Sequence, residues 1–246
     1  VFETAETAGG KLRTITGQTG EIDIGPTVLT LLPVFQNLFR SVGEDIFDHI
    51  ELVRQKIIAR HWWPDGETLD LHDDFESSRD AILNFSGPES AKEFEKYFYD
   101  TRDLFACFDI PVMQNPNPSM LDMNRAVLNN PKILFKMHPL RTLSGLLNYK
   151  FRDKRLQQLF GRYATYVGGS PLESPALLSL IWQAEARGVW SVKGGMKKLA
   201  RVLEKLAADR GASFHYNTEV KNLNIKHDRL VSVTDNLNIS HEADKF

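Results

Sequence analysis

The sequence predicts a protein of the α/β class. Two observations lead to this prediction: short strand-like segments alternate with glycine turns over residues 1–25, and a strand, a helix and a further strand follow one another over residues 188–217. The chain has 246 residues, of which 42% are hydrophobic, so it can bury one large core or two ordinary ones. Cys107 is the only cysteine, which excludes an intrachain disulfide and fits a reducing compartment.

The first half of the chain alternates helical and strand patterns. Apolar residues at helical spacing predict a helix within residues 27–43, with Gly43 as its stop. A strand is expected within residues 49–55, and two alternating segments joined by Pro-Asp-Gly at residues 64–66 predict a β-hairpin. Residues 74–109 then predict an acidic helix with an aromatic stripe.

A basic, helical section fills the middle of the chain. Residues 111–120 predict a loop, because three prolines in eight residues exclude regular structure. A basic and apolar helical section continues from there to Gly161, and another helix is expected at residues 176–187.

The last part of the chain shows the clearest supersecondary pattern. Residues 188–192 predict a strand, residues 194–211 a helix that stops at its final glycine, and residues 213–217 a second strand. Such strand-helix-strand units are typical of α/β sheets. Residues 219–233 then predict a hairpin that turns at His227 and Asp228.

Charge is distributed unevenly, although the net charge is only −2. From Asp65 to Asp109 there are 13 acidic residues against 4 basic ones, or −9, and from Arg125 to Arg155 there are 8 basic residues against 1 acidic residue, or +7. We therefore expect the two blocks to face different surroundings. No apolar run approaches the roughly 18 to 20 residues that a membrane-spanning helix requires.

Glu3 stands at the end of the first strand-like segment, where an acidic side chain can accept hydrogen bonds from both hydroxyls of an adenosine ribose. Gly9 and Gly10 follow, and a glycine doublet lets the main chain approach a bulky anionic ligand. Lys11 can offset the charge of a phosphate. The alternative is a surface glutamate followed by a simple turn, and the residues alone leave both interpretations open.

Residues 23–27 (Asp-Ile-Gly-Pro-Thr) repeat this arrangement. Gly25 has no side chain to obstruct a flat ligand, Pro26 stiffens the bend, and Thr27 precedes a predicted helix whose first amides point at the gap. Thr27 can equally be a helix N-cap. Two further glycine doublets at residues 168–169 and 194–195 permit the same two interpretations, and three doublets together suggest a cavity lined by backbone.

These residues resemble the FAD-dependent amine oxidase and phytoene desaturase superfamily. ETAETAGGKLRT followed by DIGPTVLT is similar to the second half of that superfamily's flavin-binding entry, with the acidic residue and the Gly-Gly-basic motif in register. YVGGSP and GVWSVKGGMKKL look like the bacterial carotenoid desaturases, and the string LFGRYATYVGGSPLESPALLSLIWQAEARGVWSVKGGM is similar to their hydroxycarotenoid 3,4-desaturase branch. The resemblance covers almost the whole chain.

The resemblance implies a partial Rossmann-like FAD-binding domain, an α+β substrate domain and a helical membrane-facing insertion. It assigns residues 1–43 and 188–246 to the FAD-binding domain and residues 44–187 to the substrate domain. The residues that match FAD-contacting positions are Glu3 at the ribose, Gly9, Gly10, Lys11 and Thr14 near the diphosphate, Gly25, Pro26 and Thr27 near the isoalloxazine ring, and Val220, whose backbone matches a position beside adenine. Trp190, Gly194 and Gly195 belong to a family signature beside the flavin or the substrate.

Two departures from the family pattern lead us to expect an internal fragment. The family's G-x-G-x-x-G loop precedes the ribose acid by about 20 residues, which lies ahead of Val1. The family's carboxyl-terminal flavin motif does not occur before Phe246. We therefore expect these 246 residues alone to bind FAD poorly or not at all.

The sequence assigns no catalytic residue and no metal ligand. It contains no recognisable Ser-His-Asp set, paired-carboxylate motif or metal-ligand spacing, and His61, His72 and His138 are interpreted as surface or hairpin residues rather than bases. This composition suits a flavin enzyme, because the cofactor itself accepts the hydride while the protein orients the substrate and excludes water.

The resemblance further implies desaturation of an acyclic hydroxy- or methoxycarotenoid by hydride transfer to FAD, in carotenoid biosynthesis. Residues 125–155 suit a helix at an anionic membrane surface, or an ordinary core helix with a solvated basic face. We expect a cytoplasmic, peripherally membrane-associated protein that binds no nucleic acid and passes electrons to an unidentified acceptor. The alternatives are a phytoene desaturase or carotenoid isomerase of the same fold, and a non-catalytic protein that binds pigment or lipid.

Overall fold

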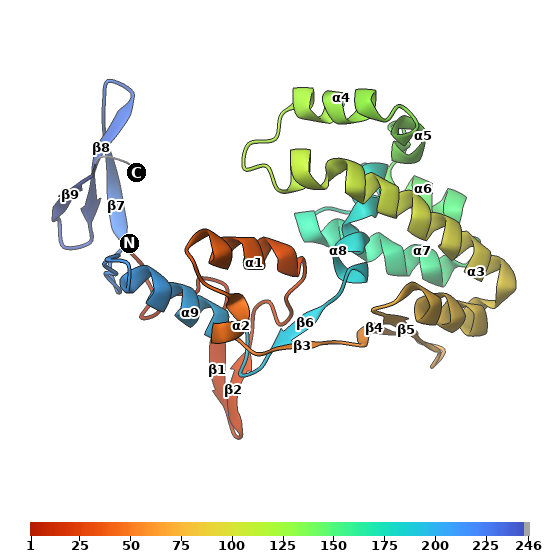
Figure 1. Ribbon diagram of the computed structural model, residues 1–246, viewed down its shortest axis with the longest axis horizontal. Coiled ribbons are helices and arrows are strands. Elements are labelled where there is room, and N and C mark those ends of the chain that lie inside the picture. Colours follow the sequence, from red (N-terminus) through yellow and green to blue (C-terminus); the bar gives the residue numbers. More distant parts are fainter. Residues whose placement is uncertain (244–246) are drawn as a thin grey trace. The chain divides into compact units, whose positions relative to one another are not determined.

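The computed structural model describes residues 1–243, which divide into two compact units. Unit 1 comprises residues 1–29, 33–53 and the chain from residue 191 onward, and unit 2 comprises residues 30–32 and 54–190. Apart from the short excursion at residues 30–32, the chain enters unit 2 within strand β3 (Leu52–Arg54) and leaves it within strand β6 (Trp190–Val192), and these two strands pair with each other. Figure 1 labels the elements of both units.

Unit 1 begins with an antiparallel hairpin of β1 (Thr14–Gly17) and β2 (Gly20–Asp23). The predicted helix at residues 27–43 is present as α1 (Leu32–Ser41), with proline in its first turn, where a missing N–H is tolerated. The short α2 (Ile46–His49) follows, capped by Asp45, whose carboxylate accepts the Phe47 N–H at 3.0 Å.

Helix α9 (Lys197–Ala208) confirms the predicted helix before Gly211 and buries Leu199, Ala200 and Leu206. Its carboxyl-terminal end is tied to the end of α1 by Arg210, which donates to the Val42 carbonyl at 2.6 Å. The amphipathic pattern of this segment therefore predicted both the helix and its buried face.

The prediction of a second strand in the strand-helix-strand unit is wrong. Residues 213–217 form no strand but make a single parallel bridge between His215 and Phe2. The His215 N–H donates to the Val1 carbonyl at 2.8 Å, and the His215 carbonyl accepts the Glu3 N–H at 2.9 Å. The extended backbone ends at Asn217, whose φ of 53° lies in the left-handed region. The bridge confirms, however, that the chain opens on extended backbone.

A three-stranded antiparallel sheet closes unit 1. The hairpin predicted over residues 219–233 is confirmed as β7 (Val220–Lys226) and β8 (Arg229–Asp235). His227 and Asp228 have φ values of 50° and 60°, as a tight two-residue hairpin turn requires. β9 (Ser240–Glu242), which the sequence did not reveal, pairs with β8.

Unit 2 begins with the predicted hairpin, formed by β4 (Ile57–Trp62) and β5 (Thr68–His72). The long α3 (Phe75–Phe108) confirms the predicted acidic helix and is capped by Asp74, which accepts the Ser77 N–H at 2.8 Å. Gly87, with a φ of 83°, bends α3 immediately before Pro88.

The predicted loop at residues 111–120 is wrong at its start. Residues Asp109–Met113 form a π-helical turn, η1, which continues from α3 and is closed by the Gln114 N–H on the Asp109 carbonyl at 2.8 Å. Pro111 is the middle residue of this turn and has no backbone N–H to donate. The loop that remains ends at α4 (Met120–Asn129), where Ser119 and Asp122 form a capping box.

The remaining helices of unit 2 are short. The basic section and the predicted helix at residues 176–187 consist of α5 (Ile133–Met137), α6 (Leu143–Lys150), α7 (Lys154–Gly161), η2 (Arg162–Val167), η3 (Ala176–Ile181) and α8 (Trp182–Ala186). The basic section is therefore a chain of helical segments rather than one helix. α6 and α7 bury their apolar residues in the unit.

Aromatic side chains form the centre of unit 2. Phe94, Tyr97, Phe160 and Trp182 are buried, and the Phe160 ring lies 4.8 Å from that of Tyr97 and 5.4 Å from that of Trp182. The Trp182 indole donates to Thr101 Oγ1 at 2.7 Å, which satisfies its buried N–H. α3, α7 and α8 are thus joined by ring packing and by a buried hydrogen bond.

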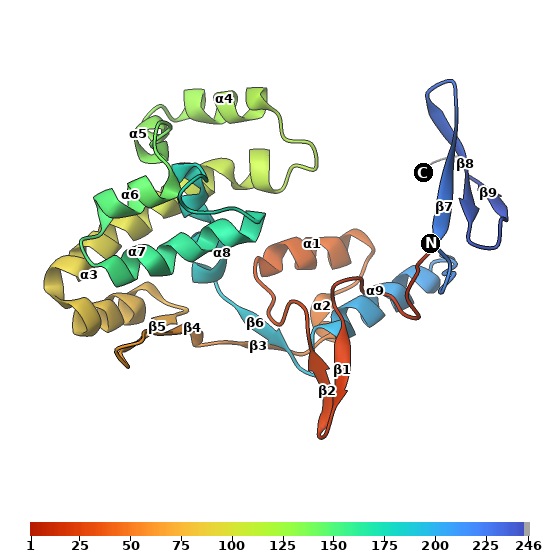
Figure 2. The same ribbon diagram turned by 180° about the vertical axis from the view of Figure 1, so that it is seen from behind.

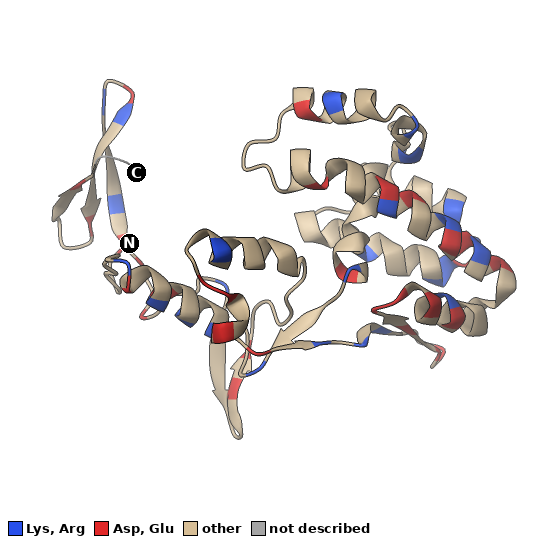
Figure 3. Ribbon diagram, viewed as in Figure 1, with Lys and Arg blue, Asp and Glu red and all other residues tan. Residues whose placement is uncertain are grey.

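The acidic and basic blocks of the sequence pair with each other in unit 2. Lys136 Nζ lies 2.6 Å from Asp103 and 3.2 Å from Asp100, and Lys150 Nζ lies 2.6 Å from Asp100. Two further pairs join the same blocks: Arg152 with Glu93 and Arg155 with Glu67. The expectation that the blocks face different surroundings is wrong, because the fold brings the helices of opposite charge together. Figure 3 shows both charges interspersed over α3.

The prediction of an α/β protein is confirmed by this mixture of helices and strands. Within residues 1–243 the strands form separate sheets of two or three strands rather than one continuous sheet. Among these residues, no helix is both long and apolar enough to cross a membrane.

Candidate cofactor-binding site

The residues predicted to contact adenosine lie on adjoining segments of unit 1. The Glu3 carbonyl accepts the Thr218 N–H at 2.9 Å, and the Ala5 carbonyl accepts the Asn217 N–H at 3.1 Å. Val220 starts β7 two residues after Thr218 and is 37% exposed. Tertiary structure therefore brings Glu3 and Val220, which lie at opposite ends of the sequence, to one end of unit 1.

The Glu3 carboxylate is held in place by its own loop. Its Oε1 accepts the Ala5 N–H at 2.8 Å and the Thr4 hydroxyl at 3.2 Å. The backbone hydrogen bond from Ala5, reinforced by the one from Thr4, lowers the pKa of Glu3 below its ordinary value. A glutamate is ionised at neutral pH even at its ordinary pKa, and an ionised carboxylate can accept hydrogen bonds from ribose hydroxyls.

The first glycine doublet forms a turn beside α9. Gly9 has a φ of 129°, and a Cβ placed on it would lie 3.3 Å from the Ala200 Cβ of α9. Gly10 has a φ of 54° and open space where its Cβ would stand, and Lys11 beside it is exposed. The two glycines therefore differ, because Gly9 allows close packing whereas Gly10 presents bare backbone to the surface.

Gly25 packs directly against this turn. A Cβ at Gly25 would lie 1.9 Å from the Lys11 carbonyl oxygen, a distance that no side chain tolerates. The Ile24 N–H donates to the Arg13 carbonyl at 2.9 Å, which holds the two segments together. The close approach of the Lys11 carbonyl therefore explains why residue 25 must be glycine, whether or not a flat ligand binds there.

Thr27 is not a helix N-cap. Because α1 begins only at Leu32, neither the N-cap alternative nor the predicted helix start directly after Thr27 is correct. Pro26 and Thr27 instead lie in an exposed connection, in which Leu31 adopts a φ of 51°. The apolar pattern marked the helix correctly, but it did not show where the connection ended.

Asp23 is the site residue to which sequence reasoning gave no role. Its Oδ2 accepts the Met196 N–H at 2.8 Å, at the start of α9. A Cβ at Gly195 would lie 3.1 Å from the same oxygen, so the doublet at residues 194–195 makes room for the carboxylate. The position of Asp23 at a strand end was a signal, because an acid can cap the start of a helix. Its partner Met196, however, lies 173 residues further along the chain.

The described residues of unit 1 thus gather the predicted positions around α9. Figure 2 shows the β1–β2 hairpin beside the beginning of this helix. Thr14 pairs with Asp23 in the hairpin, and Arg201 of α9 pairs with Glu21 at 3.3 Å. The third doublet lies in unit 2, where a Cβ at Gly169 would lie 2.4 Å from Ser174 Oγ, so packing within its own loop accounts for it.

The residues present fit FAD. Its ribose requires an ionised acid, and its diphosphate requires main chain free of side chains. Glu3 supplies the first, while Gly10 supplies open backbone with the cation of Lys11 beside it. Within residues 1–243 there is no group of three or more His, Cys, Asp or Glu side chains able to hold a metal ion.

The chain belongs to the family of flavin-containing amine oxidoreductases, whose sequence profile matches residues 1–245. The predicted membership of the FAD-dependent amine oxidase superfamily is therefore confirmed, and FAD is confirmed as the cofactor of that class. The individual FAD-contacting residues remain predictions.

Two relatives are named for their substrate. The chain is 43% identical over 220 residues to hydroxyneurosporene desaturase of Cereibacter sphaeroides. This alignment covers 89% of this chain and 44% of the relative. The chain is 40% identical over 233 residues to the enzyme of the same name from Rhodobacter capsulatus. This alignment covers 95% of this chain and 47% of the relative. The chain therefore spans somewhat less than half the length of these relatives, and the predicted resemblance to the hydroxycarotenoid branch is confirmed.

The fold is shared with two solved structures, an oxidase and an oxidoreductase. Putrescine oxidase bound to putrescine matches with a TM-score of 0.62 at 16% identity, covering 99% of this chain and 50% of that one. An oxidoreductase from Methanosarcina mazei matches with the same TM-score at 15% identity, covering 99% of this chain and 51% of that one. At these identities the likeness shows the fold alone.

Proposed function

We propose that the whole protein is an FAD-dependent desaturase of an acyclic, hydroxylated carotenoid. The observation that carries this proposal is the identity of 43% and 40% to two hydroxyneurosporene desaturases along 89% and 95% of the chain. Bound FAD supplies the acceptor for the hydride removed from the saturated carbon pair.

The residues of unit 1 would hold the cofactor. Glu3 would accept hydrogen bonds from the ribose hydroxyls, and the backbone of Val220 would lie beside adenine. The turn at Gly9, Gly10 and Lys11 would face the diphosphate, with Thr14 closing that motif. The connection formed by Gly25, Pro26 and Thr27 would lie near the flavin ring. The exposure of Gly10 and Lys11 and the ionised state of Glu3 support these roles.

These roles assign one part of the chain to the cofactor and another part to the substrate. Residues 1–43 and 188–246 would form the FAD-binding domain, and residues 44–187 would form the substrate domain. The aromatic core of unit 2, with the buried Trp182–Thr101 hydrogen bond inside it, supports a rigid framework for such a domain.

The test uses the full-length protein expressed together with an acyclic hydroxycarotenoid. We expect it to copurify with a flavin and to lengthen the conjugated system of the pigment, which absorption spectroscopy detects as a red shift. A colourless preparation that leaves the pigment spectrum unchanged would overturn the proposal. A flavin-loaded protein that binds the pigment without altering it would instead support the non-catalytic alternative.

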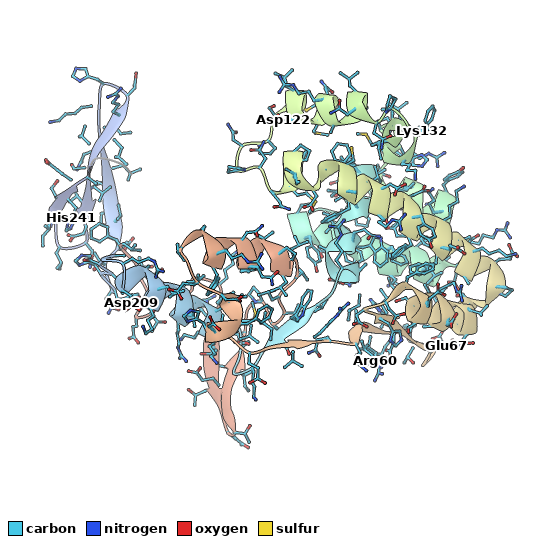
Figure 4. All side chains as sticks on the ribbon, viewed as in Figure 1. Arg60, Glu67, Asp122, Lys132, Asp209 and His241 are labelled. Atoms are coloured by element: carbon cyan, nitrogen blue, oxygen red, sulfur yellow. The ribbon has the colours of Figure 1, made fainter. Side chains whose placement is uncertain are left out.

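We also propose that part of unit 2 docks on an anionic membrane surface. Leu134, Phe135 and Leu140, around the end of α5, are 47%, 81% and 100% exposed. Lys132 and Arg141 flank them, and Figure 4 labels Lys132 where the chain enters α5. Exposed apolar side chains bordered by cations suit a lipid headgroup region. Lys136 contributes less, because Asp100 and Asp103 bind it.

Liposome cosedimentation tests this surface. We expect Phe135→Asp combined with Leu140→Asp to release the full-length protein from vesicles of phosphatidylcholine with phosphatidylglycerol. Leu172→Asp is the matched control, because Leu172 is 70% exposed elsewhere in unit 2. Equal cosedimentation of the double variant and the control would remove the claim.

A further inference from the structure

A cavity opens beside the exposed apolar side chains at the end of α5. Its volume is about 330 Å³, and it is lined by six residues: Leu134, Phe135, His138, Pro139, Leu140 and Arg141. Three of these are large apolar side chains, and the histidine and the arginine can donate hydrogen bonds to an anion. One cavity therefore offers both a hydrocarbon wall and polar donors.

A tight turn brings the two polar residues together. The Arg141 N–H donates to the His138 carbonyl at 2.9 Å, which closes a four-residue turn from His138 to Arg141. The first and last Cα atoms of such a turn lie within about 7 Å of each other. His138 has a φ of 47° at the end of α5, so the chain reverses there and leaves Leu140, which is fully exposed, inside the turn sequence.

Both polar side chains also contact the same ring, that of Tyr149 in α6. The guanidinium carbon of Arg141 lies 4.5 Å from the ring centroid of Tyr149, and the His138 ring lies edge-on to it with centroids 5.8 Å apart. Stacking uses the face of a guanidinium and leaves the N–H groups in its plane available to an anion. The turn and the shared ring therefore keep both donors beside one cavity.

Arg141 differs from its neighbouring cations because its charge is not neutralised. Asp100 lies 2.6 Å from Lys150 Nζ and 3.2 Å from Lys136 Nζ. Within residues 1–243, the Arg141 side chain has no ion pair with a carboxylate, and it makes only a long contact of 3.5 Å to the Gly145 carbonyl. Its positive charge is therefore available to a ligand at the cavity.

We propose that this cavity binds the phosphate group of one anionic phospholipid of a bilayer. Arg141 would donate to the phosphate oxygens, and His138 would donate through one ring nitrogen, which an imidazole can do in either tautomer. Phe135 and Leu140, which are 81% and 100% exposed, would lie against the acyl chains. This inference rests on the membrane docking proposed above and deepens it, because it names a discrete site for one headgroup.

The lining of the cavity favours a phospholipid over other ligands. A neutral polyene would leave the N–H groups of Arg141 without an acceptor, and free phosphate would leave the hydrocarbon wall in water. A phosphate group has more than one acceptor oxygen, so the two donors can bind different oxygens of one headgroup. The exposed apolar side chains and the unpaired cation thus match the two ends of the same amphiphile.

The experiment uses the full-length protein and dihexanoylphosphatidylglycerol below its critical micelle concentration, so that no bilayer contributes. We expect titration calorimetry to show one lipid bound per protein. Arg141→Gln should weaken this binding about 10- to 100-fold, because hydrogen bonds to a charged group are lost. Arg141→Lys should recover only part of the affinity, because an ammonium has no planar fork. Arg125→Gln is the matched control, since Arg125 is an exposed cation of the same basic block outside this cavity, and it should leave the affinity unchanged.

The outcomes separate this site from the proposals on which it rests. Absence of lipid binding by the wild-type protein, or equal affinities of Arg141→Gln and Arg125→Gln, would overturn the headgroup site. Glycerol 3-phosphate, which lacks acyl chains, should bind more weakly, and equal binding would overturn the assignment to a lipid. If Arg141→Gln does not fold, His138→Gly decides, because glycine suits the left-handed backbone there and should still weaken lipid binding. Vesicle cosedimentation tests docking independently, and desaturation of a carotenoid dispersed in detergent tests the catalytic proposal.

Discussion

Unit 1 and unit 2 achieve close packing in different ways. In unit 2 large rings fill the interior, and Phe94, Phe160 and Trp182 are all at most 2% exposed. In unit 1 two close contacts at the predicted site are made by glycine backbone: Gly25 packs on the Lys11 carbonyl and Gly195 on the Asp23 carboxylate. Unit 1 also exposes apolar strand residues, including Ile15, Ile22, Leu223 and Ile225 at 51–63%.

The difference shows which residues each unit depends on. A core of interlocking rings loses free energy when a ring is removed, because the cavity cannot collapse completely. A site built from bare backbone is instead damaged when atoms are added. The substitutions that distinguish the two units are therefore deletions in unit 2 and additions in unit 1.

The largest effect is expected from removing a ring of unit 2. Phe160→Ala should lower the free energy of unfolding by about 3–5 kcal/mol, because its ring contacts those of Phe94, Tyr97 and Phe151. Urea denaturation followed by tryptophan fluorescence measures the change. Phe135→Ala, at a ring that is 81% exposed, should change stability by less than about 0.5 kcal/mol. Equal losses would contradict the account of the core.

Adding one methyl group to unit 1 should have the next largest effect. Gly25→Ala forces the Lys11 carbonyl to move and should cost about 1–3 kcal/mol. The full-length protein should also lose flavin, which the absorbance of the purified protein records. Gly161→Ala in unit 2 is the matched control, because its Cβ would lie 3.6 Å from Pro171, an ordinary contact, and should not lower stability.

The cap of α9 should contribute a smaller amount. Asp23→Ala removes the acceptor of the Met196 N–H and should destabilise unit 1 by about 1 kcal/mol, while Asp23→Asn, which keeps an acceptor, should cost less. Hydrogen exchange at Met196 should accelerate more in the alanine variant than in the asparagine variant. The same rate in wild type and in the alanine variant would show that the carboxylate does not cap the helix.

The smallest effect is the acid dependence of unit 2. The hydrogen bond from Arg155, assisted by Ser86, lowers the pKa of Asp153 from 3.8 to about 2. Because the folded pKa lies below the unfolded one, this stability is present above about pH 4 and is lost as the pH falls toward 2. Solvent screening of the partly exposed Arg155 limits it to less than about 1 kcal/mol. Asp153→Asn should flatten the unfolding free energy between pH 2 and 4, and an unchanged slope would contradict this assignment.

Local sequence predicted the hairpins and most helices. The turns at residues 64–66 and 227–228 were identifiable because turn chemistry depends on the residues in the turn itself. The amphipathic periods of α3 and α9 identified those helices in the same way. The strand predicted at residues 213–217 is not formed, because an alternating pattern shows only that a strand is possible. The left-handed backbone of Asn217 ends the extended segment there.

Contacts between residues that are distant in the sequence could not be predicted from the sequence. Asp23 was visible as an acid at a strand end, but nothing near it in the sequence indicated Met196. Lys136 was visible in the sequence only as one cation of the basic block, because its partners, Asp100 and Asp103, lie on a different helix. His61 was interpreted as a surface or hairpin residue, and the structure places it in hairpin strand β4.

The sequence by itself determined the family, the flavin class, the main helices and hairpins, and the positions predicted to contact FAD. These depend on motifs and on the backbone preferences of neighbouring residues, which are local. Tertiary structure alone decided that the acidic and basic blocks pair with each other, that Gly25 packs on the Lys11 carbonyl, and that Asp23 bonds Met196. Those contacts join residues distant in sequence, and the choice among many possible partners is made only when the elements pack.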